Sequence, residues 1–159
     1  MKTNVRELRV GTRAPAFALA DETGKVHELD QYKAKSDVVL IFYPGDDTPG
    51  CTMQLCAVRD DIAKFRQRQA IVLGVNQADA ESHKRFIARY GLKNPLLVDE
   101  GRRVAKLYGA IGTFFGHETT KRTVVIIDVK GVVQYYKHGL PPNSELFEVL
   151  DWVNKGNMN

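Results

Sequence analysis

Two continuous apolar runs constrain the fold of this chain more than any other feature. Residues 37–43 and 70–75 are almost uninterrupted apolar segments with the length of strands. A strand that is apolar on both faces belongs in the middle of a sheet whose two faces are both covered. Each run is followed by a segment with helical periodicity, so the chain is predicted to be an α/β domain.

The remaining segments extend this pattern into a mixed sheet with helices on both faces and an N-terminal β-hairpin extension. The hairpin is expected from residues 17–19 and 26–29 around the turn 21–24. Further strands are predicted at 96–98, 123–129 and 132–137, and helices at 51–69, 79–90, 104–108 and 145–153. The glycine-rich residues 109–116 follow a helix rather than a strand, so we interpret them as a loop and not as a phosphate-binding turn.

Composition limits the classes of function. The 159 residues suffice for one domain, 1–159, and no apolar run approaches the roughly 20 residues of a membrane helix. The net charge of +4 is spread along the chain, which favours an ordinary basic surface over a nucleic-acid site. Residues 1–9 are charged and lack the apolar segment of a signal peptide, so we expect a cytoplasmic protein, although a form with its targeting segment removed would look the same.

The chain has two cysteines, Cys51 and Cys56. Cys51 falls where a strand ends, a turn intervenes and a helix begins, with Thr48 as a potential cap and Pro49 at the first helical position. A helix N-terminus offers free N–H groups and a positive dipole end, which favour a thiolate over a thiol. In open α/β sheets, reactive groups lie beyond the carboxyl ends of the central strands. The pattern therefore indicates a reactive cysteine.

Other interpretations of these residues remain open. Both cysteines could be inert core residues. A thioredoxin-type thiol–disulfide oxidoreductase would need cysteines two residues apart, and two cysteines without a nearby histidine fit no familiar zinc pattern. We therefore expect no metal and no cofactor. His83 lies on an apolar helix face and is predicted to be a hydrogen-bonded core histidine, whereas Asp46 and Asp47 are interpreted as turn residues. Phe114 and Phe115 could line a pocket or pack in a core or loop.

At this point a family resemblance is clear. The pattern Pro44-x-x-x-Thr48-x-x-Cys51 resembles the active-site motif of the peroxiredoxins. The longer string 46–52, together with Cys56, is similar to the bacterioferritin-comigratory or Q-type subfamily. Residues 95–99, 104–109 and 122–128 also resemble stretches of that family, so the likeness covers about residues 8–153.

The resemblance implies a thioredoxin-like fold and a thiol-dependent peroxidase that reduces hydrogen peroxide and organic hydroperoxides. By position, Cys51 matches the peroxidatic cysteine and Cys56 the resolving cysteine. Thr48 and Arg122 match the residues that orient the peroxide and hold the thiolate, and Pro44 matches the residue that shields the sulfur. Two features depart from the family: Gln54 stands where many members have glutamate, and the segment 112–122 looks shorter than in several relatives.

The spacing of the cysteines predicts a conformational change. Five residues of an α-helix separate two Cα atoms by about 8.6 Å. A disulfide rarely spans more than about 7 Å, so an intrachain Cys51–Cys56 bond requires the helix between them to unwind. One chain could then complete the cycle, which favours a monomer, and the family implies recycling by a thioredoxin-like reductant. The alternative is a redox-switched binding or chaperone module, or a peroxide sensor, in which unwinding exposes Leu55 and Val58.

Overall fold

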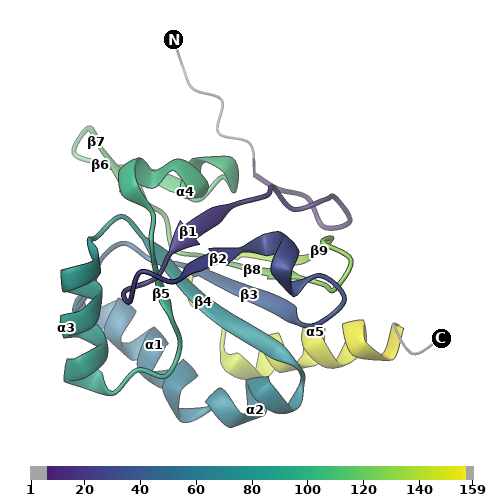
Figure 1. The fold of residues 1–159 in the computed structure, drawn as a ribbon. Coiled ribbons are helices and arrows are strands. Elements are labelled where there is room, and N and C mark those ends of the chain that lie inside the picture. The colour runs from purple at the N-terminus through teal and green to yellow at the C-terminus, as the bar shows by residue number, and fades with distance from the viewer. Residues whose placement is uncertain (1–6, 157–159) are drawn as a thin grey trace.

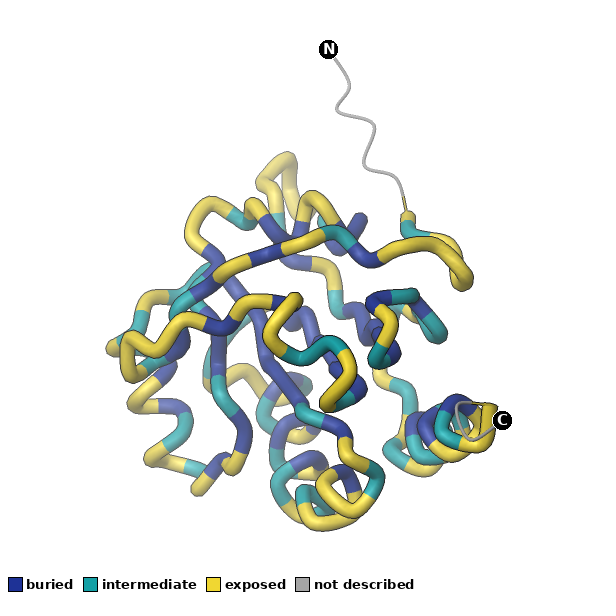
Figure 2. Tube along the Cα trace, turned by 45° about the vertical axis from the view of Figure 1, so that its right-hand side comes forward, coloured by how far each residue is buried: buried dark blue, intermediate teal, exposed yellow. Residues whose placement is uncertain are grey.

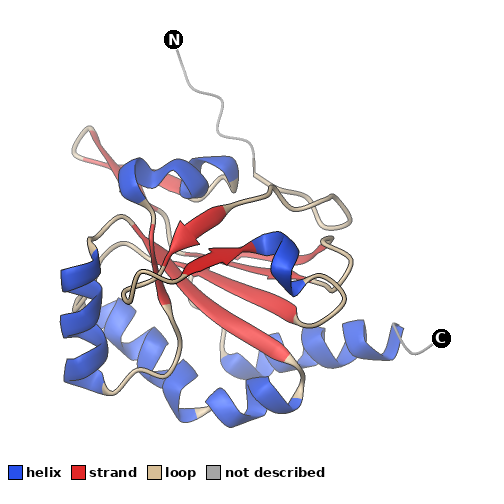
Figure 3. Cartoon of the chain, in the orientation of Figure 1, coloured by secondary structure: helices blue, strands red, loops and turns tan. Residues whose placement is uncertain are grey.

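A five-stranded mixed sheet forms the centre of the molecule (Figures 1 and 3). The computed structural model describes residues 7–156. Residues 1–6, which include most of the charged start of the chain, and residues 157–159 lie outside that range. The strand order is β5-β4-β3-β8-β9. The strands are β3 (Asp37–Phe42), β4 (Ala70–Asn76), β5 (Leu96–Val98), β8 (Thr123–Ile127) and β9 (Val133–His138).

Strand direction brings two distant segments to one edge of this sheet. Strands β3, β4 and β5 are parallel, so their carboxyl ends share an edge. Strand β8 runs antiparallel to β3, with Phe42 opposite Thr123. The start of β8 therefore lies at the same edge, and Arg122, one residue before β8, is placed beside the chain that leaves β3.

Helices cover one face of the sheet, and a smaller layer covers the other. Helices α1 (Pro49–Asp60), α2 (Ile62–Gln67), α3 (Ala80–Tyr90) and α5 (Asn143–Gly156) pack against the first face. Helix α4 (Arg103–Leu107) packs on the second face together with the hairpin of β1 (Ala18–Ala20) and β2 (Val26–Glu28). Two 3-10 helices, η1 (Leu29–Tyr32) and η2 (Glu100–Arg102), complete these layers. Within residues 7–156, no helix is both long enough and apolar enough to span a membrane.

The two layers explain why the central strand is apolar from Val38 to Phe42, after its first residue Asp37. Val38, Leu40 and Phe42 of β3 join the core beneath the hairpin and α4. Val39 and Ile41 point to the other face and join the core beneath the four helices. All six residues of β3 are buried, and Figure 2 shows the sheet as the buried centre of the tube. This confirms the interpretation of residues 37–43 as a central strand.

Two predictions about secondary structure need correction. The helix expected over 51–69 begins at Pro49 and is interrupted at Asp61, where φ is −106° and ψ is 13°, so it becomes two helices, α1 and α2. Residues 109–116 are not a plain loop. They contain β6 (Ile111–Phe114), which pairs antiparallel with β7 (His117–Thr120) in a projecting hairpin. Figure 1 shows this hairpin beside α4.

Candidate active site

The loop 43–48 carries the chain from β3 to the start of α1 and places Cys51 in the first helical turn. Pro49 occupies the first position of the helix, where its missing N–H costs no hydrogen bond. Thr48 is at the N-cap position as predicted, but its hydroxyl does not cap the helix. The hydroxyl instead donates to the carbonyl oxygen of Gly45 at 3.1 Å, which tightens the loop.

Arg122 and Cys51 are in direct contact. The Nη2 atom of Arg122 lies 3.4 Å from the Sγ atom of Cys51, and its Nη1 donates to the side-chain oxygen of Gln54 at 3.0 Å. Among the described residues, Arg122 forms no ion pair with a carboxylate, so the sulfur is its one potential anionic neighbour within hydrogen-bond range. The guanidinium therefore places a positively charged hydrogen-bond donor beside the sulfur.

Gly50 makes this contact possible. A Cβ atom at position 50 would lie 2.9 Å from the Nη2 atom of Arg122, closer than real Cβ atoms approach a neighbour. The lack of a side chain at Gly50 therefore lets the guanidinium lie against the first turn of α1.

The two cysteines differ in how far they are buried. Cys51 is 0 % exposed and packs with the apolar residues beneath the four helices, so its sulfur lies between that core and a guanidinium. Cys56 is partly exposed, and both cysteines are free thiols. Both also lie within the continuous helix α1. Two Cα atoms five residues apart in an α-helix are too far apart for a disulfide, so the helix must unwind before Cys51 and Cys56 can be joined.

The other predicted site residues lie on the loop but do not all converge on the sulfur. Thr48 and Pro44 are exposed. The carbonyl oxygen of Pro44 accepts a hydrogen bond from Gln77 at 3.1 Å, and Gln77 accepts one from Thr120 at 2.8 Å. The roles of Thr48, Pro44 and Cys56 in catalysis stay predictions. The 3.4 Å contact between Cys51 and Arg122, in contrast, is observed in the structure.

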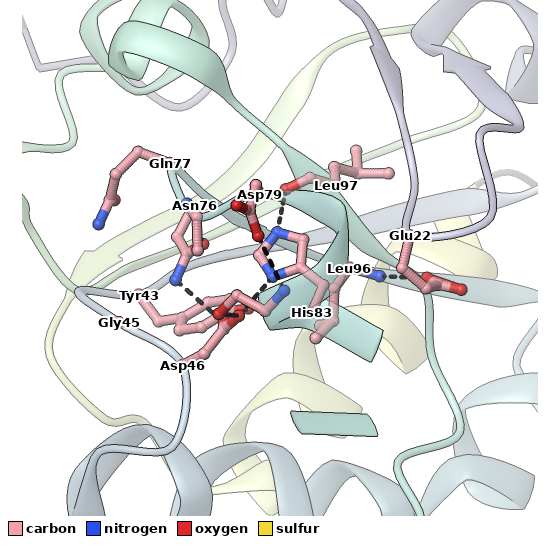
Figure 4. Close-up of polar contacts among 12 residues, drawn as sticks. Glu22, Tyr43, Gly45, Asp46, Asn76, Gln77, Asp79, His83, Leu96 and Leu97 are labelled. Carbon is pink, nitrogen blue, oxygen red and sulfur yellow. Dashed lines mark hydrogen bonds and ion pairs between the residues drawn. The ribbon is translucent and has the colours of Figure 1, made fainter. Parts of the chain in front are cut away.

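Asp46 is more than the turn residue that the sequence suggested. Its carboxylate accepts hydrogen bonds from the hydroxyl of Tyr43 at 2.7 Å and from the amide of Asn76 at 3.2 Å. Its second oxygen lies 2.7 Å from both the Ser82 hydroxyl and the Nδ1 atom of His83 (Figure 4). The prediction that His83 is a hydrogen-bonded core histidine is confirmed. Polar residues following neighbouring strands, Asp46 after β3 and Asn76 at the end of β4, were the available signal for this network.

The next residue anchors the same loop to the end of α3. The carboxylate of Asp47 accepts hydrogen bonds from Arg89 at 2.6 Å and from the hydroxyl of Tyr90 at 2.7 Å. Asp47 also has a positive φ of 56°, a conformation that aspartate tolerates better than most residues. Two consecutive carboxylates therefore tie the loop to one helix.

Two further expectations concern the phenylalanines Phe114 and Phe115 and a possible metal site. Phe114 and Phe115 stack edge to face at the end of β6 and are 65 % and 87 % exposed, so they do not pack in a core. They pack against each other where β6 turns toward β7. Within residues 7–156, no group of three or more potential ligands is arranged to hold a metal ion.

Comparison with known proteins identifies the family of this chain. Residues 10–136 match the AhpC/TSA family. The chain belongs to this family. It is 44 % identical over 141 residues to a protein named peroxiredoxin Q, chloroplastic, from Triticum aestivum, a match that covers 88 % of this chain and 64 % of that relative. It is 41 % identical to the peroxiredoxin Q of Sedum lineare over 88 % of this chain and 75 % of the relative. The chain thus spans slightly less than two thirds of the length of the cereal relative.

Solved structures of the family have the same fold. The crystal structure of peroxidoxin BcpB from Mycobacterium tuberculosis superposes with a TM-score of 0.85, at 26 % identity over 92 % of this chain and 99 % of that chain. A Xylella fastidiosa PrxQ mutant superposes with a TM-score of 0.83, at 24 % identity over 96 % and 99 % of the two chains. The expectation of a thioredoxin-like α/β fold is confirmed.

Proposed function

We propose that this protein is a thiol-dependent peroxidase that reduces hydroperoxides through Cys51. The observation that carries the proposal is the 3.4 Å contact between the Cys51 sulfur and the Arg122 guanidinium at the start of a helix. In the first step the Cys51 thiolate attacks one peroxide oxygen. A sulfur–oxygen bond forms and the oxygen–oxygen bond breaks. The departing hydroxide or alkoxide takes up a proton, and Cys51 becomes a sulfenic acid.

Stabilisation of charge must supply most of the rate. Complete ionisation of an ordinary cysteine at pH 7 increases the thiolate only about thirtyfold, far less than typical enzymatic accelerations of about 10⁶ or more. Arg122 and the N–H groups at the start of α1 are fixed donors beside the reacting sulfur. Such donors stabilise the negative charge that develops on the departing oxygen.

Cys56 completes the proposed cycle. Its thiolate attacks the sulfenic sulfur of Cys51, a sulfur–sulfur bond forms and the sulfur–oxygen bond breaks, and the departing hydroxide takes up a proton to leave as water. Helix α1 must unwind between the two residues for this step. We propose that a thioredoxin-like dithiol then reduces the disulfide and that the protein works as a monomer in the cytoplasm. The family and the spacing of the cysteines support the first two of these statements, and the cytoplasmic location remains a prediction from the composition.

Intact-mass measurement after one equivalent of peroxide tests this chemistry. The reduced wild-type chain is expected to lose two hydrogen atoms as a monomer. The Cys56→Ser variant is expected to retain one added oxygen, and the Cys51→Ser variant should not change. If Cys51→Ser consumed peroxide as fast as the wild type, the proposal would be wrong.

A second function deserves a direct comparison, because Leu55 and Val58 are buried within the helix that must unwind. Their exposure on oxidation would suit a redox-switched binding module or a sensor. Peroxide consumption with an excess of a dithiol reductant distinguishes the two. An enzyme consumes many equivalents per chain, whereas a sensor without a dedicated reductant consumes one.

A further inference from the structure

A buried carboxylate–imidazole pair connects the loop before Cys51 to the body of the protein. The side chains of Asp46 and His83 are 6 % and 0 % exposed, and their Oδ2 and Nδ1 atoms are 2.7 Å apart. Figure 4 shows the imidazole of His83 held between this carboxylate and the backbone carbonyl of Leu97. The distance from the Nε2 atom of His83 to that carbonyl oxygen is 3.0 Å.

Hydrogen bonds hold the pair on several sides. Both ring nitrogens of His83 face acceptors, one a carboxylate oxygen and the other a backbone carbonyl oxygen. Burial alone would raise the pKa of Asp46, but the hydrogen bond and the charge of His83 hold it below its usual value. Burial and the charge of Asp46 raise the pKa of Tyr43 well above its usual value, so the Tyr43 hydroxyl stays protonated and donates to the carboxylate.

The pair is joined to the reacting residues by a short stretch of chain. Asp46 precedes Thr48 by two residues and Cys51 by five. The carbonyl oxygen of Thr48 accepts from the N–H of Thr52 at 2.8 Å, so the position of this loop sets where α1 begins. The 3.4 Å contact between Cys51 and Arg122 depends on where α1 begins, because Arg122 lies in a separate segment, just before β8.

We propose that Asp46 and His83 are positioning residues that hold the loop 43–48 so that Cys51 meets Arg122, and that they thereby set the rate of attack on peroxide. This inference rests on the proposed function. Neither residue touches the sulfur. Removing one partner leaves a buried polar group of the other without its hydrogen bond, and the loop is expected to shift to relieve this loss. A displacement of about 1 Å in a reacting group can cost about 10²-fold in rate.

A second buried pair in the same protein provides a matched control. The Nε2 atom of His27 lies 2.7 Å from Asp21, and both side chains are buried, as in the first pair. The pair lies on the β1–β2 hairpin, and neither side chain hydrogen-bonds to the loop 43–48. His27→Gln therefore removes an imidazole of the same kind that makes no hydrogen bond to the loop before α1.

The test separates the two chemical steps in single-turnover stopped-flow experiments. We expect Asp46→Asn and His83→Gln to slow sulfenic acid formation at Cys51 by about tenfold or more. The subsequent disulfide formation, which needs α1 unwound, should not slow. His27→Gln should change the first step less than about twofold, even where urea unfolding shows a comparable loss of stability. In the double variant Asp46→Asn/His83→Gln, the loss should be smaller than the product of the two single losses, because the residues act as one pair.

Several outcomes would overturn the positioning role. One is that Asp46→Asn and His83→Gln form sulfenic acid within about twofold of the wild-type rate. Another is that His27→Gln loses as much as they do. If the wild type itself consumed no peroxide, the proposed function would fail. The rate of Cys51 alkylation by iodoacetamide would then report on positioning separately, and equal rates in the wild type and both variants would reject it.

Discussion

Asp37, the first residue of β3, is an unpaired acid in the interior, and its removal should stabilise the protein. It is 1 % exposed, and neither carboxylate oxygen has a hydrogen-bond partner in the part of the chain that the structure describes. Burial, and secondarily the negative charge of Asp128, raises the pKa of Asp37 to about 6. The oxygens of Asp128 accept hydrogen bonds from the backbone N–H groups of Lys130 and Val132 and from the side-chain amide of Gln134.

The raised pKa determines both the size and the sign of the effect. A rise from the ordinary value of 3.8 to about 6 corresponds to about 3 kcal/mol, at 1.36 kcal/mol per pKa unit. Because the folded state binds the proton more tightly, the wild type is favoured while Asp37 is protonated and loses stability as the pH rises from about 4 to about 6. Asp37→Asn has no proton to lose. The variant should match the wild type near pH 4 and exceed it by up to about 3 kcal/mol at pH 8.

Urea unfolding of the reduced protein between pH 4 and pH 8 measures this difference. The free energy of unfolding of the wild type should fall by up to about 1.4 kcal/mol per pH unit relative to Asp37→Asn across the titration, and the difference should become constant above about pH 7. Asp30→Asn, which changes an exposed acid, is the control and should show no such trend. A constant difference between Asp37→Asn and the wild type at every pH would refute the reasoning.

Three further predictions concern the cysteine site. Arg122→Ala should leave the fold intact and lower the rate of peroxide reduction by far more than about thirtyfold, the most that ionisation alone supplies, and a loss of less than threefold in stopped-flow peroxide consumption would contradict its role. Gly50→Ala should raise helix stability by up to about 1 kcal/mol in urea unfolding and yet slow the reaction, because the new Cβ displaces the Arg122 guanidinium. An unchanged rate would show that the contact with Cys51 is dispensable. Amide exchange in residues 50–60 should accelerate on formation of the Cys51–Cys56 disulfide, and unchanged protection would argue against unwinding.

The helices and strands that the sequence predicted well are those whose bounds are set by residues within or next to them. Residues 96–98 form β5 as expected, because a short apolar run is sufficient to define a buried strand. Helix α3 ends at Tyr90 because Gly91 takes a left-handed conformation with φ of 62°, and Asp79 caps its start through Ser82. In each case the residues that determine the element lie within or next to it.

The features that were missed depend on contacts between distant segments. The interruption at Asp61 coincides with a hydrogen bond from Asn143, 82 residues further along the chain. The side chain of Asp46 finds His83 on α3, 37 residues away, so a local interpretation as a turn residue was natural but incomplete. The pattern of the sequence thus predicted the position of Cys51 in the first turn of a helix, but not the network that holds the preceding loop.

The break between α1 and α2 limits how far unwinding of α1 can spread along the chain. Helix formation is cooperative, so a continuous helix from 49 to 67 would tend to lose its turns together. The backbone departs from helical geometry at Asp61, and α2 beyond it is held separately by the packing of Phe65 against Phe147, with ring centroids 4.8 Å apart. If α1 unwinds in each turnover as proposed, this boundary keeps the unwinding from reaching α2, which continues to cover the hydrophobic interior.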